Sequence, residues 1–141
     1  MTETQTPDRV VATDAAVQLL TKLSELHGGL MIHQSGGCCD GSAPMCYPVG
    51  EYRVGQRDVL VGVIDLPEPL PPVRLWINGD QFDLWKHTQL ILDVVPGRGA
   101  GFSLEAPEGV RFLSRSRAFS PEENELLEKS PPLTGAMVEA G

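Results

Sequence analysis

The chain has 141 residues, 41% of them hydrophobic, which fits a single folded domain with its own core. Its formal net charge is −8, with 19 acidic residues against 11 Lys and Arg. Nucleic-acid backbones and anionic membranes repel so acidic a chain, so neither is expected as a partner. The N-terminus has neither the basic nor the apolar region of a signal peptide, and no apolar run approaches the roughly 20 residues that span a bilayer. We therefore expect a cytoplasmic protein.

Residues 1–9 form a predicted flexible tail, 10–130 a single globular domain and 131–141 a second flexible tail. A helix is predicted to begin after Thr13, whose side chain can cap it, with Asp14 at its positive end. Apolar residues recur with helical spacing as far as Leu26, and Gly28-Gly29 ends the pattern. The domain therefore opens on an amphipathic helix.

After this helix the pattern becomes typical of strands. Apolar stretches bounded by turn residues predict strands at 30–34, 52–54, 59–64, 73–77, 90–95, 102–105 and 110–113. The proline-rich segment 67–72 is expected to be an exposed connector, because proline donates no ladder hydrogen bond. Residues 80–88 fit a helix or a strand equally well, and Ser120-Pro-Glu-Glu123 has the capping-box pattern of a short helix. The predicted fold class is α+β, a compact β-rich single domain with an N-terminal helix.

All three cysteines, Cys38, Cys39 and Cys46, lie within nine positions, and His33 precedes them. An odd number of cysteines, two of them adjacent in the sequence, argues against a disulfide framework. Thiolates bind soft metals and iron–sulfur clusters, and imidazole suits zinc, copper or iron. Adjacent side chains on an extended chain point apart, so Cys38 or Cys39 with Cys46 and a histidine is the more reasonable ligand set. His87 is a candidate ligand from a distant segment.

Other interpretations stay open for the same residues. A free cysteine behaves as a small buried hydrophobe, so the Gly-Gly-Cys-Cys segment also fits a tightly packed turn. Gly36 and Gly37 are expected to form a tight turn that brings Cys38 beside the strand ending at Gln34. His33 also fits a hydrogen-bonded structural residue, and His87 a half-buried surface residue.

Three arginines near the end of the domain are separated by even numbers of residues, four and then two. Arg111, Arg115 and Arg117 share one face if their segment is extended. Such a stripe on an acidic protein fits either internal ion pairing or the docking of a partner.

Four segments together resemble a small bacterial family of uncharacterised proteins with the motif HQSGGCCDGS-PMCYP. They are residues 33–48, 82–90, 93–105 and 111–116, and the resemblance covers about residues 10 to 125. Members are often encoded beside aldehyde dehydrogenases, so the resemblance implies such an enzyme as a partner. It implies no biochemical activity.

A weaker resemblance links the chain to the HesB/IscA-type iron–sulfur carriers. It rests on a helix, then a strand leading to Ser-Gly-Gly-Cys38, then several strands and Gly-Phe-Ser-Leu-Glu105. It implies a HesB-like fold and a cluster ligand at Cys38. Those carriers use a further Cys-Gly-Cys pair where this chain reads Leu-Ser-Arg-Ser-Arg at 113–117, so the usual three-thiol site is incomplete.

The sequence therefore predicts a small accessory protein that binds a transition metal or an iron–sulfur cluster and supports an aldehyde dehydrogenase, rather than a stand-alone enzyme. The predicted metal ligands are drawn from Cys38, Cys39, Cys46, His33 and His87. One alternative is a thiol-based redox enzyme that uses Cys38 or Cys39, and another is a structural partner protein without metal. The sequence predicts no oligomeric state.

Overall fold

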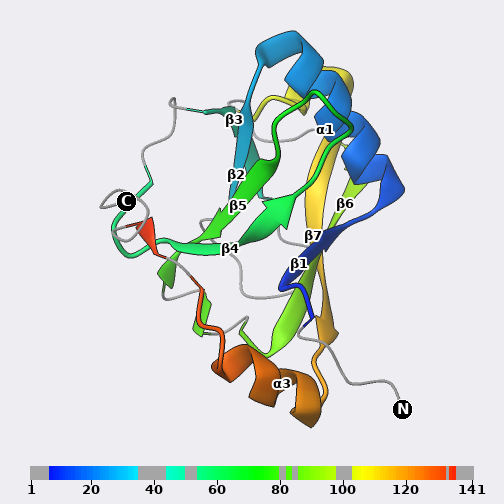
Figure 1. Ribbon diagram of the computed structural model, residues 1–141. Coiled ribbons are helices and arrows are strands. Elements are labelled where there is room, and N and C mark those ends of the chain that lie inside the picture. Colours follow the sequence, from blue (N-terminus) through cyan, green and yellow to red (C-terminus); the bar gives the residue numbers. More distant parts are fainter. Residues whose placement is uncertain are drawn as a thin grey trace.

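The computed structural model describes residues 7–34, 44–49, 54–79, 82–83, 86–97, 103–132 and 134–135. Within these ranges two sheets and two α-helices form an α+β fold, as predicted (Figure 1). The three-stranded sheet has the order β1 (Val10–Ala12), β6 (Thr88–Pro96) and β7 (Val110–Ala118). The four-stranded sheet has the order β3 (Met45–Pro48), β2 (Leu30–Gln34), β5 (Val73–Ile77) and β4 (Val59–Ile64).

One hydrophobic core joins the two sheets. The three-stranded sheet contributes Leu90, Leu92 and Phe112, and the four-stranded sheet contributes residues such as Ile32 and Leu75. The helix α1 (Asp14–His27) lies against both β6 and β2 and adds Leu20 and Leu23 to the same core (Figure 1). The fold is therefore a two-sheet body that α1 covers at one end.

The ends of α1 agree with the prediction. The Thr13 side chain accepts a hydrogen bond from the Ala16 N–H at 3.2 Å, and Gly28 ends the helix with φ 84°, where a side chain would be strained. The Thr13 hydroxyl also donates to Asp93 Oδ1 of β6 at 2.9 Å. One residue thus starts the helix and attaches it to the sheet.

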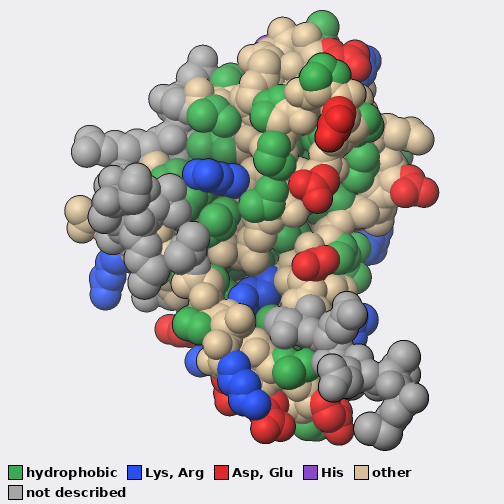
Figure 2. Space-filling view, in the orientation of Figure 1, with side chains coloured by type: hydrophobic (Ala, Val, Ile, Leu, Met, Phe, Trp, Pro, Cys, Tyr) green, Lys and Arg blue, Asp and Glu red, His purple; other side chains and the backbone are tan. Residues whose placement is uncertain are grey.

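The short helix α3 (Pro121–Glu128) also begins as predicted, with a complete capping box between Ser120 and Glu123. Its far end is closed by a residue from the other end of the chain. Arg9 Nη2 donates to the carbonyls of Leu127 at 2.9 Å and Ser130 at 2.7 Å. Acidic and basic side chains gather at this end of the molecule (Figure 2). Neither α1 nor α3, the helices among the described residues, is long and apolar enough to cross a membrane.

The strand predictions were confirmed for β2, β4 and β5, and the proline-rich connector contains no strand. The strands β6 and β7 are longer than predicted, because they pair along all nine residues from Thr88↔Ala118 to Pro96↔Val110. The helical hydrogen bonds Phe82 N→Asn78 O and Lys86 N→Phe82 O indicate helical turns before β6. In the predicted strand 52–54, residues 52 and 53 lie outside the described residues, and Val54 is in no strand.

Two strands were not predicted and one prediction was wrong. β1 lies between the predicted tail 1–9 and the predicted helix, in residues to which no element was assigned, and β3 lies in the predicted cysteine loop. The two strands have only three and four residues. In the predicted strand 102–105, residues 103–105 form a turn that leads into the 3₁₀ helix η1 (Ala106–Glu108). The cause is the contact with β3, where the Leu104 N–H donates to the Cys46 carbonyl.

Candidate functional site

The cysteine segment connects two paired strands. β2 and β3 run antiparallel with His33 opposite Met45, so residues 35–43 lead from one strand to its neighbour. Cys38 and Cys39 lie outside the described residues, as does the predicted turn at Gly36 and Gly37. The structure therefore describes the base of this segment, from His33 and Gln34 on one side to Cys46 on the other.

Cys46 points into the core. It pairs with Ile32 across the β2–β3 ladder and is fully buried in the same hydrophobic cluster. Its N–H donates to Ser103 Oγ at 2.8 Å, and its carbonyl accepts from the Leu104 N–H at 3.0 Å. Burial raises the pKa of the Cys46 thiol far above its usual value, and the charge of Glu105 raises it further. In the absence of a cation, Cys46 is therefore a buried thiol and not a reactive thiolate.

Glu105 is the acidic neighbour of Cys46. It is 1% exposed, and the Ser103 hydroxyl donates to its carboxyl group. Burial raises the pKa of Glu105, and the hydrogen bond from Ser103 opposes that shift. We call Cys46 and Glu105 the buried acid pair, because Ser103 links them and each has a raised pKa. A bound cation would favour the ionised form of each group.

Sequence reasoning missed Glu105 as a site residue. The segment Phe102-Ser-Leu-Glu105 alternates apolar and polar residues, which in a half-buried strand places the polar ones in solvent. Here Ser103 and Glu105 are the buried residues, because the segment turns and hydrogen-bonds to β3 instead of entering a sheet. The sequence feature that could have indicated Glu105 is a carboxylate two residues after a serine, with the apolar Phe102 and Leu104 beside them.

His33 lies on the other face of the four-stranded sheet. It follows Ile32, the core-facing partner of Cys46, and successive strand residues point to opposite faces. Its ring is 3% exposed, with Nε2 3.1 Å from Asp58 Oδ2. Asp58 Oδ2 also accepts from the Gly55 N–H at 2.8 Å. The structure therefore places His33 with Asp58 and does not bring it to Cys46.

His87 lies in a third place, directly before β6 and beside α3. Its Nδ1 is 3.4 Å from Asn124 Oδ1. Glu105, by contrast, leads through η1 into β7 at the other end of the β6–β7 ladder. The described candidates therefore do not converge. Over the residues with described positions, no three His, Cys, Asp or Glu side chains form a metal-binding group, and Cys38 and Cys39 are not among those residues.

The arginine stripe lies on β7 as an extended segment, as predicted. Arg115 Nε donates to Asp93 Oδ2 at 2.8 Å, and Arg117 makes two 3.1 Å contacts with the Glu123 carboxylate. The hydrogen bond from Arg115 holds the pKa of Asp93 below its usual value, and that from Arg117 lowers the pKa of Glu123 to about 2. Internal ion pairing is therefore confirmed for Arg115 and Arg117. Docking of a partner on the stripe stays a prediction.

A family model described as a domain of unknown function (DUF779) matches residues 19–118. The chain belongs to this family. The matched range includes the β2–β3 pair, the buried acid pair and the segment around His87. Neither a curated protein nor a solved structure matches the chain significantly. The description of this family gives no activity.

Proposed function

We propose that this protein is a small cytoplasmic accessory protein that binds a transition metal or an iron–sulfur cluster at the base of the cysteine segment and supports an aldehyde dehydrogenase. The observation that carries the metal-binding proposal is the buried acid pair. A thiol and a carboxyl group are buried together, and each becomes anionic at a cost that a cation would remove.

The donor set fits a borderline or soft cation. Cys46 offers a sulfur ligand and Glu105 a carboxylate oxygen, and both types are found in protein zinc and iron sites. Cys38 and Cys39, in the connection between β2 and β3, are the proposed sources of the remaining thiolates. When bound, the metal or cluster would supply ligand-exchange or electron-transfer chemistry. Ser103 would hold Glu105 in place, and the core around Ile32 would exclude water from Cys46.

The proposed client follows from the family resemblance, in which members are often encoded beside aldehyde dehydrogenases. A HesB-like ancestry is part of the same proposal, since the Ser-Gly-Gly-Cys38 strand end resembles that of iron–sulfur carriers. In this chain Cys46 and Glu105 would replace the C-terminal Cys-Gly-Cys pair of those carriers.

A second candidate is a thiol-based redox protein that uses Cys38 or Cys39 without a metal. The burial of Cys46 favours Cys38 or Cys39 as the reactive thiol in this candidate, because a buried thiol with a raised pKa, such as that of Cys46, is a poor nucleophile. A metal-free protein with one rapidly alkylated thiol at Cys38 or Cys39 would support this candidate over the first.

The test is elemental analysis with an absorption spectrum of protein purified without oxygen or chelator. We expect about one equivalent of metal, or a cluster, and its loss in Cys46→Ser and Glu105→Gln. The matched control is Ile32→Val, which perturbs the same core position at a cost of about 0.5–1.5 kcal/mol but removes no donor. Metal retained in both site variants would exclude the buried acid pair, and no metal after reconstitution with iron, zinc and copper would refute the proposed function.

A further inference from the structure

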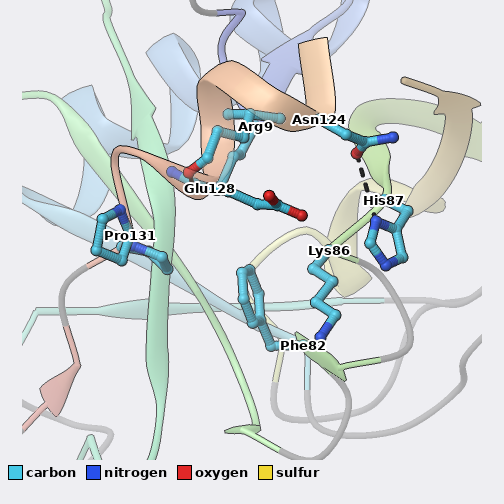
Figure 3. A pocket seen from close by; sticks show the side chains of 9 residues that line it. Arg9, Phe82, Lys86, His87, Asn124, Glu128 and Pro131 are labelled. Atoms are coloured by element: carbon cyan, nitrogen blue, oxygen red, sulfur yellow. Dashed lines mark hydrogen bonds between the residues drawn. The ribbon is translucent and has the colours of Figure 1, made fainter. Parts of the chain in front are cut away.

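A pocket of about 190 Å³ opens between α3 and the turn that precedes β6 (Figure 3). Asn124 and Glu128 line it from α3, and Phe82, Lys86 and His87 line it from the opposite side. It lies at the other end of the β6–β7 ladder from the turn that holds Glu105, so it is separate from the proposed metal site. It also contains part of the Phe82–His87 segment, which the proposed function does not use.

Hydrogen bonds within the protein hold the walls of the pocket. Arg9 fixes the end of α3 through the carbonyls of Leu127 and Ser130. The Lys86 N–H donates to the Phe82 carbonyl at 2.8 Å, which fixes the opposite wall. The His87–Asn124 contact joins the two walls. The pocket is therefore preformed, which reduces the entropy that a ligand must overcome on binding.

The interior of the pocket is apolar. Phe82, the buried Leu127 and Pro131 contribute side chains to its lining. A smaller cavity that shares Arg9, Phe82 and Lys86 continues inward to Ile77 and Leu90 of the core. The main pocket, of about 190 Å³, is large enough to hold several water molecules. It suits a compact apolar group of about the size of one aromatic ring.

The rim carries charges that would orient a ligand. The Lys86 side chain is 46% exposed, and its Nζ is 4.0 Å from the carboxylate of Asp83, itself 74% exposed, so the pair is weak. The guanidinium of Arg9 already donates hydrogen bonds to the carbonyls of Leu127 and Ser130. Glu128 faces Lys86 and His87 from the α3 side (Figure 3). An anionic group would therefore be attracted to Lys86 and repelled from Glu128.

We propose that this pocket binds a small organic anion, a carboxylate on an apolar group of about ring size. The carboxylate would lie at Lys86 Nζ, and the apolar group against Phe82 and Leu127. Among the charged residues that line the pocket, Arg9 and Lys86 are cationic and Glu128 is anionic, on a chain of net charge −8. The inference does not depend on the cysteines or on a metal.

The test is a titration of ¹⁵N-labelled full-length protein with benzoate, followed by the amide signals of Lys86, His87 and Asn124. We expect saturable shifts, and weaker binding of benzyl alcohol, which has the same ring without the charge. Lys86→Gln should weaken benzoate binding about two- to fivefold, and Glu128→Gln should strengthen it by about the same factor, as expected for exposed charges. Both side chains are exposed, so neither change is expected to unfold the protein.

The matched control is Lys22→Gln, since Lys22 is also an exposed lysine near one carboxylate, Glu108, but does not line this pocket. It should leave the benzoate affinity unchanged. Shifts that do not saturate, equal affinity for benzoate and benzyl alcohol, or equal effects of Lys22→Gln and Lys86→Gln would each overturn the proposal.

Discussion

Glu105 holds its proton more tightly in the folded protein than in the unfolded chain, because burial raises its pKa from the usual 4.5. Linkage turns this difference into a pH dependence of stability. The contribution of Glu105 to the free energy of unfolding is fully present below about pH 4.5, where its carboxyl group is protonated in both the folded and the unfolded state. It is lost as the pH rises through the pKa of the folded state, since the unfolded chain can then ionise freely.

The replacement Glu105→Gln should remove this pH dependence. Glutamine can still accept the hydrogen bond from Ser103 but has no proton to lose. In chelator-treated protein, we expect the wild-type melting temperature to fall relative to that of the variant as the pH rises from 4 to 8. Thermal melts across this range measure the difference. The control is the exposed Glu125→Gln, and a wild-type-like pH profile in Glu105→Gln would contradict the assignment.

Among the elements, β1 and β4 come unusually close although they belong to different sheets. A Cβ built on Gly62 would lie 2.5 Å from Val10 Cγ1. Gly62 also follows an irregularity in the β4–β5 ladder, where the register shifts between Leu60 and Gly62. The glycine therefore allows the two sheets to approach where β1 crosses β4.

The replacement Gly62→Ala should destabilise the protein by about 1–3 kcal/mol, because the core must shift to admit one methyl group. In a Val10→Ala background, which removes the Cγ1 atom, the same replacement should cost much less. Denaturant unfolding of the two single variants and the double variant measures this coupling. Additive effects would show that the close contact does not limit the approach of the sheets.

The elements that the sequence predicted best are those whose signals are local. α1 and α3 were found because Thr13, Gly28 and the Ser120 capping box act within one helical turn. β1 was missed because its strand character depends on pairing with Leu90–Leu92, some 80 residues later in the chain. No local pattern in three residues contains that information.

In the candidate site too, local sequence features could be predicted and contacts between distant segments could not. The composition of the cysteine segment identified Cys46 and His33, but their separation onto opposite faces follows from the pairing of β2 with β3. Glu105 enters the site because residues 103–105 turn and bind β3, a contact across 57 residues from Ser103 to Cys46. Such contacts depend on tertiary packing, which the residues at either end do not reveal.

For the whole molecule, the proposed role predicts that binding of the dehydrogenase and its protection are separable. The double variant Cys38→Ser, Cys39→Ser should still co-purify with an aldehyde dehydrogenase, the proposed client, because serine preserves the size and charge of the two side chains. It should no longer protect that enzyme from loss of activity under oxidation, to which a catalytic thiol is susceptible. The measurement is residual dehydrogenase activity after exposure to peroxide with each variant.

The control for this experiment is Lys22→Gln, which alters an exposed charge on α1 and no cysteine, and which should protect as the wild type does. Full protection by the cysteine variant would remove Cys38 and Cys39 from the function. Absence of any complex at micromolar concentrations would remove the proposed client.

The link between Arg9 and the end of α3 has a consequence for synthesis on the ribosome. β1 emerges well before its partners, because Leu90, with which Val10 pairs, lies 80 residues later in the chain. The carbonyls that Arg9 holds belong to Leu127 and Ser130, which are later still. At about 5–20 residues per second, the wait for β6 alone lasts roughly 4–16 s. Throughout that time β1 has no partner strand in its own sheet, and α1 can pack only against the four-stranded sheet, whose strands end at Ile77. The contact that joins Arg9 to the end of α3 therefore forms only after Ser130 has been made, long after β1.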